Sequence, residues 1–408
     1  MTAWTRSVRE SFARLFKSLR HRGYRLFFTA FVANQMGFWL ANLAMQGIMV
    51  DLTDNDPSWV GRLFFALFSP SLLFAPIAGV VADRVDRRVM LVLCYVAVAA
   101  TSAVMAVLAA SGAMGPASLM GLAFVCGIAF SFAGPASNAI AANIVDTDDL
   151  ASAISLQSTA NNLTRVIGPA VAAPLIAGAR YATSFVIFSV ASLVAAGFVY
   201  VIRVPDYERD SEGAGIWERL RSGLAHARER SPAMLALATA CVLSVFGVAH
   251  TALIPSFAQE VLGSREAFPW IFASTGVGAM AGAMITGVEG RPKLRRSTFR
   301  LFLYGVALIG FALSRTVVWA LVAEAIVGFF YFSVMTSIQT LLQEIVDDAK
   351  RGRIMSLFFV AWGGMFPVGA LMLGEVAKRV GVGVAVTGSG AICLLVGAAL
   401  TLFLRDRR

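Results

Sequence analysis

The sequence predicts an all-α membrane protein, and three observations favour this class. Of its 408 residues, 58% are hydrophobic and only 14% are charged. The mean hydropathy of +0.74 exceeds what a soluble core needs, because a soluble domain must still cover its surface with polar groups. Apolar runs of about 20 residues, the length of helix that spans a bilayer, recur along the chain between short polar breaks.

We expect twelve membrane-spanning helices. The apolar runs are continuous, whereas the strands of a membrane barrel alternate apolar and polar residues over about ten positions, so helices are favoured over a barrel. The expected spans are 26–50, 58–82, 89–110, 116–142, 151–177, 181–203, 232–258, 266–288, 298–315, 317–343, 353–378 and 382–404.

The spans are expected to form two six-helix bundles related by a repeat. Ile144-Val145-Asp146 matches Ile345-Val346-Asp347 at the same place in each half, after the fourth span. The longest polar break lies at the midpoint of the chain. The expected parts are a basic amphipathic tail over 1–25, an N-terminal bundle over 26–203, a linker over 204–231, a C-terminal bundle over 232–404 and a short tail over 405–408.

The positions of Lys and Arg predict the orientation. Most of these 34 residues fall in the first 25 positions and in alternate breaks, near 83, 204–231, 289–300 and 350. By the positive-inside rule these segments and both termini face the cytoplasm. The formal charge of +10 is then explained by attraction to anionic inner-leaflet lipid, and no nucleic acid is expected as a partner. We expect a multi-pass protein of the cytoplasmic membrane that works as a monomer.

Several kinds of chemistry lack the residues they need. No glycine is followed by Lys and then Ser or Thr, so the phosphate-binding P-loop is absent and uphill work must draw on an ion gradient. The four cysteines lie in apolar runs without a close pair, and neither HExxH nor GxSxG occurs. We therefore expect no cofactor, no metal and no enzyme activity. A membrane sensor that transports nothing is an open alternative.

A charged turn between the second and third spans carries a family resemblance. It places five charges within six positions, in the sequence Gly79-Val-Val-Ala-Asp83-Arg84-Val-Asp86-Arg87-Arg88. The turn resembles the signature loop of the major facilitator superfamily, with Asp86 where glycine is common. The positive-inside rule accounts for the arginines but not for the two acids. The resemblance implies that Asp83 lies against the positive end of the eleventh helix and helps to close the cytoplasmic side, and that Gly79 permits close helix approach.

Two further segments resemble one branch of the superfamily. In the fifth span, Arg165-Val-Ile-Gly168-Pro169 resembles a small-residue motif of exporters, and Arg351-Gly352-Arg353 precedes the eleventh span. Together they resemble the branch with the enterobactin exporter and macrolide-efflux proteins. The resemblance implies alternating access and export of small amphipathic molecules, of drug or siderophore type, in exchange for protons. An uptake symporter of the same fold is the alternative.

If a twofold axis relates the halves, a second charged contact is expected on the cytoplasmic side. One loop is acidic and the other basic, so opposite charges would meet as a latch. The residues of this expected latch are Asp146, Asp148, Asp149, Arg291, Lys293, Arg295 and Arg296. The alternative is that both loops are hydrated and that their ion pairs contribute little.

Polar residues within spans are costly and are candidates for the transport path. These candidates are Asn34, Gln35, Asn42, Gln46, Asn138, His250 and Glu324. The amides could instead form interhelical hydrogen bonds, and His250 could be a packing element rather than a proton carrier. Glu324 cannot be buried cheaply without a partner or a proton, so we expect it to take part in proton coupling with Arg165 as a counter-charge. The competing interpretation places Glu324 in water at the outer interface.

The glycines of the eighth span are expected to serve packing. Gly276-Val-Gly278-Ala-Met-Ala-Gly282 lies inside an apolar run, without the strand that a nucleotide-binding loop requires. Gly278 and Gly282 instead form a small-xxx-small surface that lets a neighbouring helix approach.

Overall fold

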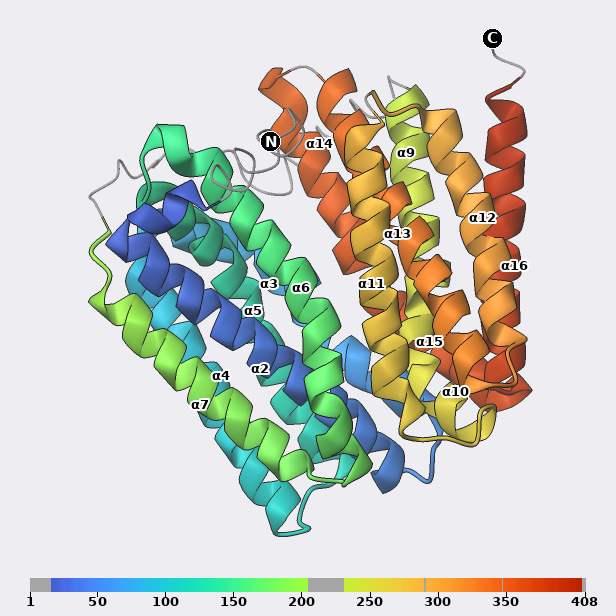
Figure 1. The fold of residues 1–408 in the computed structure, drawn as a ribbon, viewed down its shortest axis with the longest axis horizontal. Coiled ribbons are helices and arrows are strands. Elements are labelled where there is room, and N and C mark those ends of the chain that lie inside the picture. Colours follow the sequence, from blue (N-terminus) through green and yellow to red (C-terminus); the bar gives the residue numbers. More distant parts are fainter. Residues whose placement is uncertain (1–15, 205–230, 290, 347, 406–408) are drawn as a thin grey trace, which may run out of the picture.

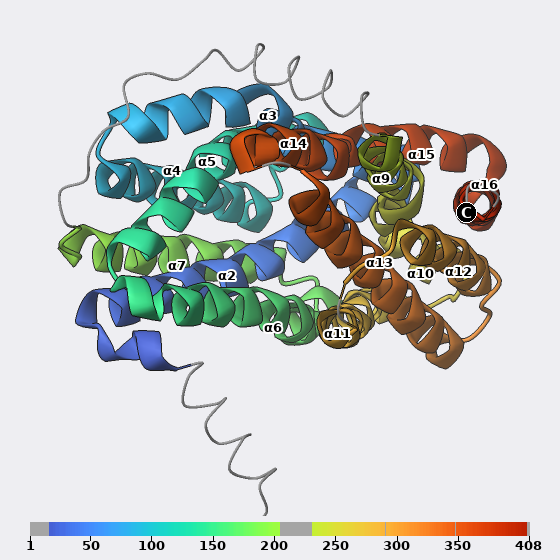
Figure 2. The same cartoon turned by 90° about the horizontal axis from the view of Figure 1, so that it is seen from above.

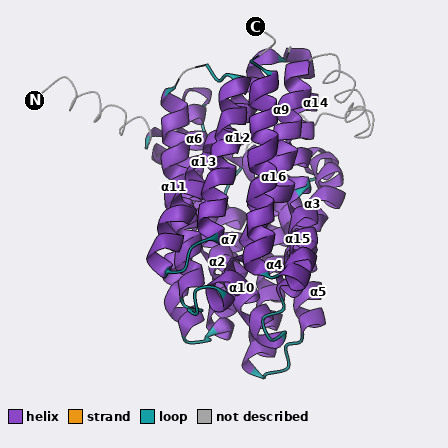
Figure 3. Cartoon of the chain, turned by 90° about the vertical axis from the view of Figure 1, so that its right-hand side faces the viewer, coloured by secondary structure: helices purple, strands orange, loops and turns teal. Residues whose placement is uncertain are grey.

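The computed structural model describes residues 16–204, 231–289, 291–346 and 348–405, and these are helical apart from short connections. Figure 3 shows the described chain as helices joined by loops, without a strand. The all-α prediction is confirmed. The first 15 residues, most of the predicted linker and the last three residues lie outside the described part of the chain, so most of the expected amphipathic tail and of the linker is not addressed.

The first half of the described chain folds into one group of long helices (Figure 1). Short 3-10 turns, η1 (Lys17–Arg20) and η2 (Thr147–Asp149), precede the first and fifth of them. The helices are α2 (Arg22–Leu52), α3 (Pro57–Arg84), α4 (Arg87–Ala110), α5 (Pro116–Asn143), α6 (Leu150–Ala177) and α7 (Tyr181–Val201).

The second half forms a second group, in which two helical runs are interrupted. One run consists of α9 (Ser231–Val242), the π turn η3 (Leu243–Gly247), the 3-10 turn η4 (Val248–Leu253) and α10 (Ile254–Glu260). The other consists of α14 (Asp348–Phe359), the π turn η5 (Val360–Gly364) and α15 (Phe366–Val380). The uninterrupted helices are α11 (Ala267–Val288), α12 (Leu294–Ala312), α13 (Val317–Ile345) and α16 (Val382–Phe403).

Nine helical runs of the described chain are long and apolar enough to cross a membrane. Each interrupted run contributes one of them, over Pro232–Glu260 and Ile354–Val380. Large apolar side chains also point outward, as at Val107 and Leu395, where a soluble protein would place polar groups. Helices α3, α6 and α12 lie at three further predicted spans but do not meet the same test within the described residues.

Close helix contacts depend on glycine, as expected for α11. A Cβ atom added to Gly278 would clash with the carbonyl oxygen of Ala325, and one added to Gly282 would clash with that of Phe329. Both carbonyls belong to α13, so the predicted small-xxx-small surface is confirmed. Without side chains in the way, the backbones of α11 and α13 can approach closely.

The two groups of helices meet at one end and diverge toward the other (Figure 1). Figure 2 shows α3 beside α15, and α6 beside α11, so these helices form the boundary between the groups. We call the end with the turn after α2 and the turn before α11 the joined end. The opposite end, with the starts of α6 and α12, is the splayed end.

Candidate functional site

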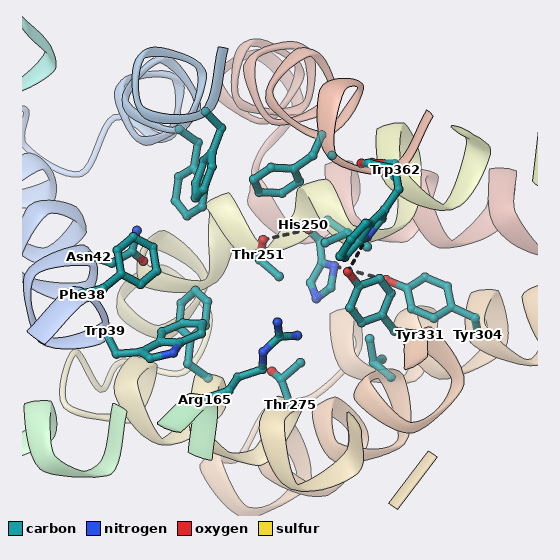
Figure 4. A pocket seen from close by; sticks show the side chains of 18 residues that line it. Phe38, Trp39, Asn42, Arg165, His250, Thr251, Thr275, Tyr304, Tyr331 and Trp362 are labelled. Atoms are coloured by element: carbon teal, nitrogen blue, oxygen red, sulfur yellow. Dashed lines mark hydrogen bonds between the residues drawn. The ribbon is translucent and has the colours of Figure 1, made fainter. Parts of the chain in front are cut away.

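A cavity of about 260 Å³ lies between the two groups of helices (Figure 4). One wall comes from α2, α3 and α6, and the other from η3, η4, α11, α12, α13, η5 and the start of α15. Its surface is mainly aromatic, with rings from both groups. The rings include Phe38, Trp39, Phe64, Phe272, Trp362 and Phe366. Such walls suit the apolar body of a small molecule.

Small residues and helix interruptions shape this cavity. A Cβ atom on Gly168 would clash with Trp39, so the glycine lets α6 pack against α2 at the level where Trp39 reaches the cavity. Trp362 belongs to the π turn η5, and its indole Nε1 donates a 2.8 Å hydrogen bond to the Tyr331 hydroxyl. Pro169, which follows Gly168, is buried within α6. The exporter-like motif of the fifth predicted span, which lies in α6, thus has a packing role that its sequence alone did not reveal.

His250 and Glu324 form a buried pair at the cavity wall. His250 lines the cavity from η4, and its Nε2 lies 3.1 Å from Oε1 of Glu324 on α13. The hydroxyl of Thr275 donates a 2.9 Å hydrogen bond to the same carboxylate oxygen. Glu324 is 0% exposed, so the interpretation that places it in water at the outer interface is wrong.

The contacts of His250 determine where its protons lie. Nδ1 is 2.7 Å from the carbonyl oxygen of Gly247, which can only accept, so we assign a proton to Nδ1. The Tyr304 hydroxyl is farther from this nitrogen, at 3.5 Å. The contact between Nε2 and Glu324 then requires one proton between the two groups. With that proton the pair is neutral overall, and without it the pair carries one buried negative charge.

Arg165 lines the cavity from α6, beside Thr275 in Figure 4, and its guanidinium pairs with rings rather than with Glu324. Its guanidinium lies 4.7 Å from the ring centre of Phe332 and 5.9 Å from that of Trp39, both within range of cation–π attraction. Its electrostatic neighbour is the Tyr331 side chain, and its Nε is buried without a hydrogen-bond partner. The counter-charge that the sequence assigned to Arg165 is therefore supplied to Glu324 by His250.

The predicted amides divide between two cavities. Asn42 lines the cavity of Figure 4. Gln46, one turn farther along α2, donates a 2.8 Å hydrogen bond to Oδ1 of Asn42. Asn34, Gln35 and Asn138 line a second cavity of about 280 Å³ within the first group of helices. The amides of Asn34 and Gln35 also bond to neighbouring helices, 3.0 Å to Ser192 and 2.7 Å to Asn161 respectively.

The charged turn after α3 contains a helix cap. Asp86 is the N-cap of α4, and its carboxylate accepts hydrogen bonds from the backbone N–H groups of Arg88 and Val89. This capping role accounts for Asp86, which the positive-inside rule does not explain. Arg88 in turn donates to the carbonyl oxygen of Ile202, just after α7. The surroundings of Gly79 and the side chains of Asp83 and Arg84 are not described, so the expected Asp83 contact is not addressed. Arg87 is the first residue of α4.

The acidic side of the predicted latch contacts another partner. Lys17, Arg20 and His21 surround Asp149, with Lys17 Nζ at 2.8 Å and His21 Nε2 at 2.8 Å. Hydrogen bonds from Lys17 and His21 lower the pKa of Asp149 to about 2. Because the pKa is depressed, these contacts are stabilising above about pH 4 and are lost only as the pH falls toward 2. Asp146 pairs with Arg20, whereas Asp148 is exposed.

The basic side of the predicted latch is not paired with these acids in this conformation. Arg296 contacts Glu289 at 3.3 Å, and Arg300, which the sequence analysis did not single out, binds the same carboxylate. The hydrogen bond from Arg300 lowers the pKa of Glu289. The exposed side chains of Arg291, Lys293 and Arg295 have no ion pair in the described part of the chain. The structure therefore does not bring the two sides of the latch together.

Ion pairs close the joined end, and the sequence analysis did not find them. Asp51 accepts a 2.6 Å hydrogen bond from Arg265, and Asn55 donates a 2.8 Å hydrogen bond to Glu260. Further contacts join α3 and its N-cap to α15. They are Asp56 with Lys378 at 2.6 Å and Arg62 Nε with Glu375 at 3.0 Å.

These contacts all link the first group of helices to the second. Burial raises the pKa of Asp56, but hydrogen bonds from Lys378 and Ser58 outweigh this effect and lower it overall. Asp56 therefore remains ionised and paired at neutral pH. No signal in the sequence pairs these residues, because each partner lies in a turn or helix end far away along the chain.

Residues 13–407 match the protein family described as transmembrane secretion effector. The chain belongs to this family of major facilitator transporters. The staphyloferrin A transporter of Staphylococcus aureus is 22% identical over 91% of this chain and 94% of its own length. Macrolide efflux protein A of Streptococcus pyogenes is also 22% identical, with the same coverage. The protein is thus a membrane transporter of the cell membrane, and its family and these relatives are transporters rather than enzymes.

Solved structures show the same fold. A bacterial homologue of the human lysosomal transporter Spinster, in an inward-facing and unoccupied conformation, has a TM-score of 0.72 and 15% identity, with 94% of this chain and 96% of that chain covered. A POT family transporter in complex with a thioalcohol-conjugated peptide has a TM-score of 0.76 and 11% identity at the same coverage. Since identity is low, these likenesses concern the fold alone.

Proposed function

We propose that this protein exports a small amphipathic molecule across the cytoplasmic membrane by alternating access, and that a proton bound between His250 and Glu324 couples the transport. The observation that carries this proposal is the location of a one-proton site in the wall of an aromatic cavity between the two groups of helices. Intramembrane ionisable groups that line a cavity are typical of proton-linked transport. The family and the macrolide-efflux relatives support the outward direction.

The proposed topology has twelve spans in two six-helix bundles with both termini in the cytoplasm. Support for this topology comes from the nine apolar runs and from α3, α6 and α12, which lie near the remaining three predicted positions. The charge bias of the sequence then places the splayed end in the cytoplasm. In this orientation the conformation is inward-facing, with the outer end closed by the ion pairs of the joined end. Alternating access requires these pairs to separate while the splayed end closes.

The predicted cytoplasmic latch belongs to that second conformation. The acids at the start of α6 and the bases at the start of α12 both lie at the splayed end (Figure 1). In the present conformation Asp149 is occupied by Lys17, Arg20 and His21. We infer that closure brings the exposed bases toward Asp146 and Asp148. A latch involving Asp83 stays a prediction from the family resemblance.

Neutralising the carboxylate tests the coupling proposal. Everted vesicles that hold an acidic interior should lose their pH gradient when a transported compound is added. We expect a response to at least one member of a panel of macrolides and carboxylate-bearing amphiphiles with the native protein, and none with Glu324→Gln, because the variant cannot exchange the proton. Glu266→Gln, an exposed acid in the turn before α11, is the matched control and should respond normally.

Two outcomes would contradict the proposal. If Glu324→Gln vesicles respond like native ones, coupling lies at another residue. If the native protein responds to no compound, the result contradicts proton-coupled export and supports the alternative that the protein is a membrane sensor.

An uptake symporter is the second candidate, and the charge of Arg165 favours it. The guanidinium faces the same cavity as the His250–Glu324 pair. An anionic solute would neutralise Arg165 and thereby make it easier for the pair to hold its proton. Solute and proton would then favour each other's binding, which is the linkage of cotransport rather than of exchange.

A further inference from the structure

Arg165 is the one residue with a fixed charge among the described residues that line the cavity. Glu324 does not line it, because the carboxylate is fully buried behind His250 and Thr275. The proton shared by His250 and Glu324 leaves that pair neutral. The cavity as it stands in the protonated form therefore carries a net positive charge, located on the α6 wall.

The charge of Arg165 is not compensated by an acid. Its described neighbours are the rings of Phe332 and Trp39 and the side chain of Tyr331, and none of these carries a negative charge. The Tyr331 hydroxyl bonds the guanidinium and also accepts a 2.8 Å hydrogen bond from the indole of Trp362. The Nε of Arg165 is buried and has no hydrogen-bond partner. The side chain is partly buried, and a desolvated positive charge with an unpaired Nε donor is costly unless an anion accepts from it.

The space next to Arg165 is arranged for a molecule with two unlike ends. Figure 4 shows the guanidinium pointing into the cavity between Trp39 on one side and Tyr331 on the other. Beyond it the walls are aromatic, with Phe38 and Trp362 on opposite sides. Guanidinium groups bind carboxylates through paired hydrogen bonds, and rings take up apolar groups.

We propose that the transported solute is an amphiphile whose carboxylate binds Arg165 and whose apolar body packs against the aromatic walls. This inference rests on the proposed function, since it names the class of solute for the same cavity. It excludes permanent cations, because a cation would meet the positive charge of Arg165 without a counter-charge in reach.

A matched set of probes tests the proposal without any gradient. The purified protein in lipid nanodiscs is titrated calorimetrically with 1-naphthaleneacetate, with the neutral 1-naphthaleneacetamide and with the cation 1-naphthylmethylammonium. Because the three share one ring system, ring packing is nearly matched, and nanodiscs without the protein measure how much of each probe partitions into lipid. We expect the carboxylate to bind at least about tenfold more tightly than the amide, because a charge-assisted hydrogen bond contributes that much affinity. The cation should bind most weakly of the three.

Variants locate the preference. Arg165→Gln should lose the preference for the carboxylate while still binding the amide, and retained amide binding shows that the variant is folded. Arg180→Gln, at an exposed position in the turn between α6 and α7, should keep the preference. The proposal is overturned if the amide or the cation binds native protein as tightly as the carboxylate, if Arg165→Gln keeps the preference, or if no carboxylate from naphthaleneacetate to pyrenebutyrate binds.

The binding result is separate from the proposed function. Carboxylate binding at Arg165 without any effect on a pH gradient would leave the solute site standing and contradict proton-coupled transport. If cationic compounds instead dissipate the pH gradient, proton-coupled transport would stand and the carboxylate site at Arg165 would be contradicted.

Discussion

At the scale of single residues, the site combines one bound proton with one fixed positive charge. His250 has its Nδ1 committed to Gly247 and its Nε2 facing Glu324, so the pair gains or loses a single proton. Arg165 faces the same cavity from the other wall. When both the proton and the charge of Arg165 are present, they repel each other across a poorly hydrated space. A bound anion removes that repulsion.

This charge arrangement predicts the sign of the proton linkage. Adding 1-naphthaleneacetate to native protein in weakly buffered solution should cause uptake of a fraction of a proton per binding site, because the carboxylate neutralises Arg165 and favours the protonated pair. A pH indicator dye measures the change. The uptake should be absent in Glu324→Gln, which has no carboxylate to titrate. Proton uptake would support the uptake symporter and contradict export by proton exchange for a carboxylate solute, whereas release of protons would support the export proposal.

At the scale of elements, the sequence predicted most helices but not where they break. The expected span 116–142 compares with α5 (Pro116–Asn143), and 382–404 with α16 (Val382–Phe403). Apolar runs of membrane length determine such elements almost alone. The turns η3 and η5 fall inside runs that were expected to be continuous, since hydropathy does not register a change in backbone hydrogen bonding.

The site depends on those breaks and on packing between distant helices, so only part of it was predictable. His250 and Glu324 were each singled out because polar groups in spans are rare. Their pairing could not be inferred, because it depends on how η4 packs against α13. Arg165 was expected to serve Glu324, and only the packing of α6 against α2 shows that it faces aromatic rings instead. The joined-end pairs left no pattern in the sequence at all.

Two glycines of α11 offer a test of helix packing. Gly278→Ala should destabilise the protein by about 1 to 3 kcal/mol, because the added Cβ collides with the backbone carbonyl of Ala325 on α13 and forces the helices apart. Gly287→Ala is the control within the same helix, since its Cβ would meet nothing within 4 Å. Thermal unfolding in detergent should show a clear decrease in melting temperature for the first variant only. Equal melting temperatures would contradict the close contact.

At the scale of the whole molecule, the contacts at the joined end and those proposed for the splayed end favour different conformations. Ion pairs join the two groups of helices at the joined end. In the proposed cycle, the charges at the splayed end meet only after the groups of helices tilt. Each exposed ion pair contributes only about 0.2 to 1 kcal/mol. Because conformations of a transporter differ by a few kcal/mol, several such pairs are enough to decide which one is populated.

Reversing one pair should therefore shift the balance between conformations. Arg62→Glu places two acids together at the joined end, because Glu375 is the partner of Arg62 and each is 36% exposed. Repulsion should open this end and favour the conformation in which the splayed end closes. A cysteine pair at Asp148 and Arg295, one on each side of the proposed latch, should then cross-link several-fold faster.

The compensating double variant supplies the control. Arg62→Glu combined with Glu375→Arg restores opposite charges and should return the cross-linking rate toward that of the native pair, whereas a nonspecific effect of Arg62→Glu would persist in the double variant. The same comparison tests the latch, because Asp148 and Arg295 approach only if the starts of α6 and α12 meet. If the rate is indifferent to the charges at the joined end, the two ends are not linked and alternating access by tilting of the two groups is contradicted.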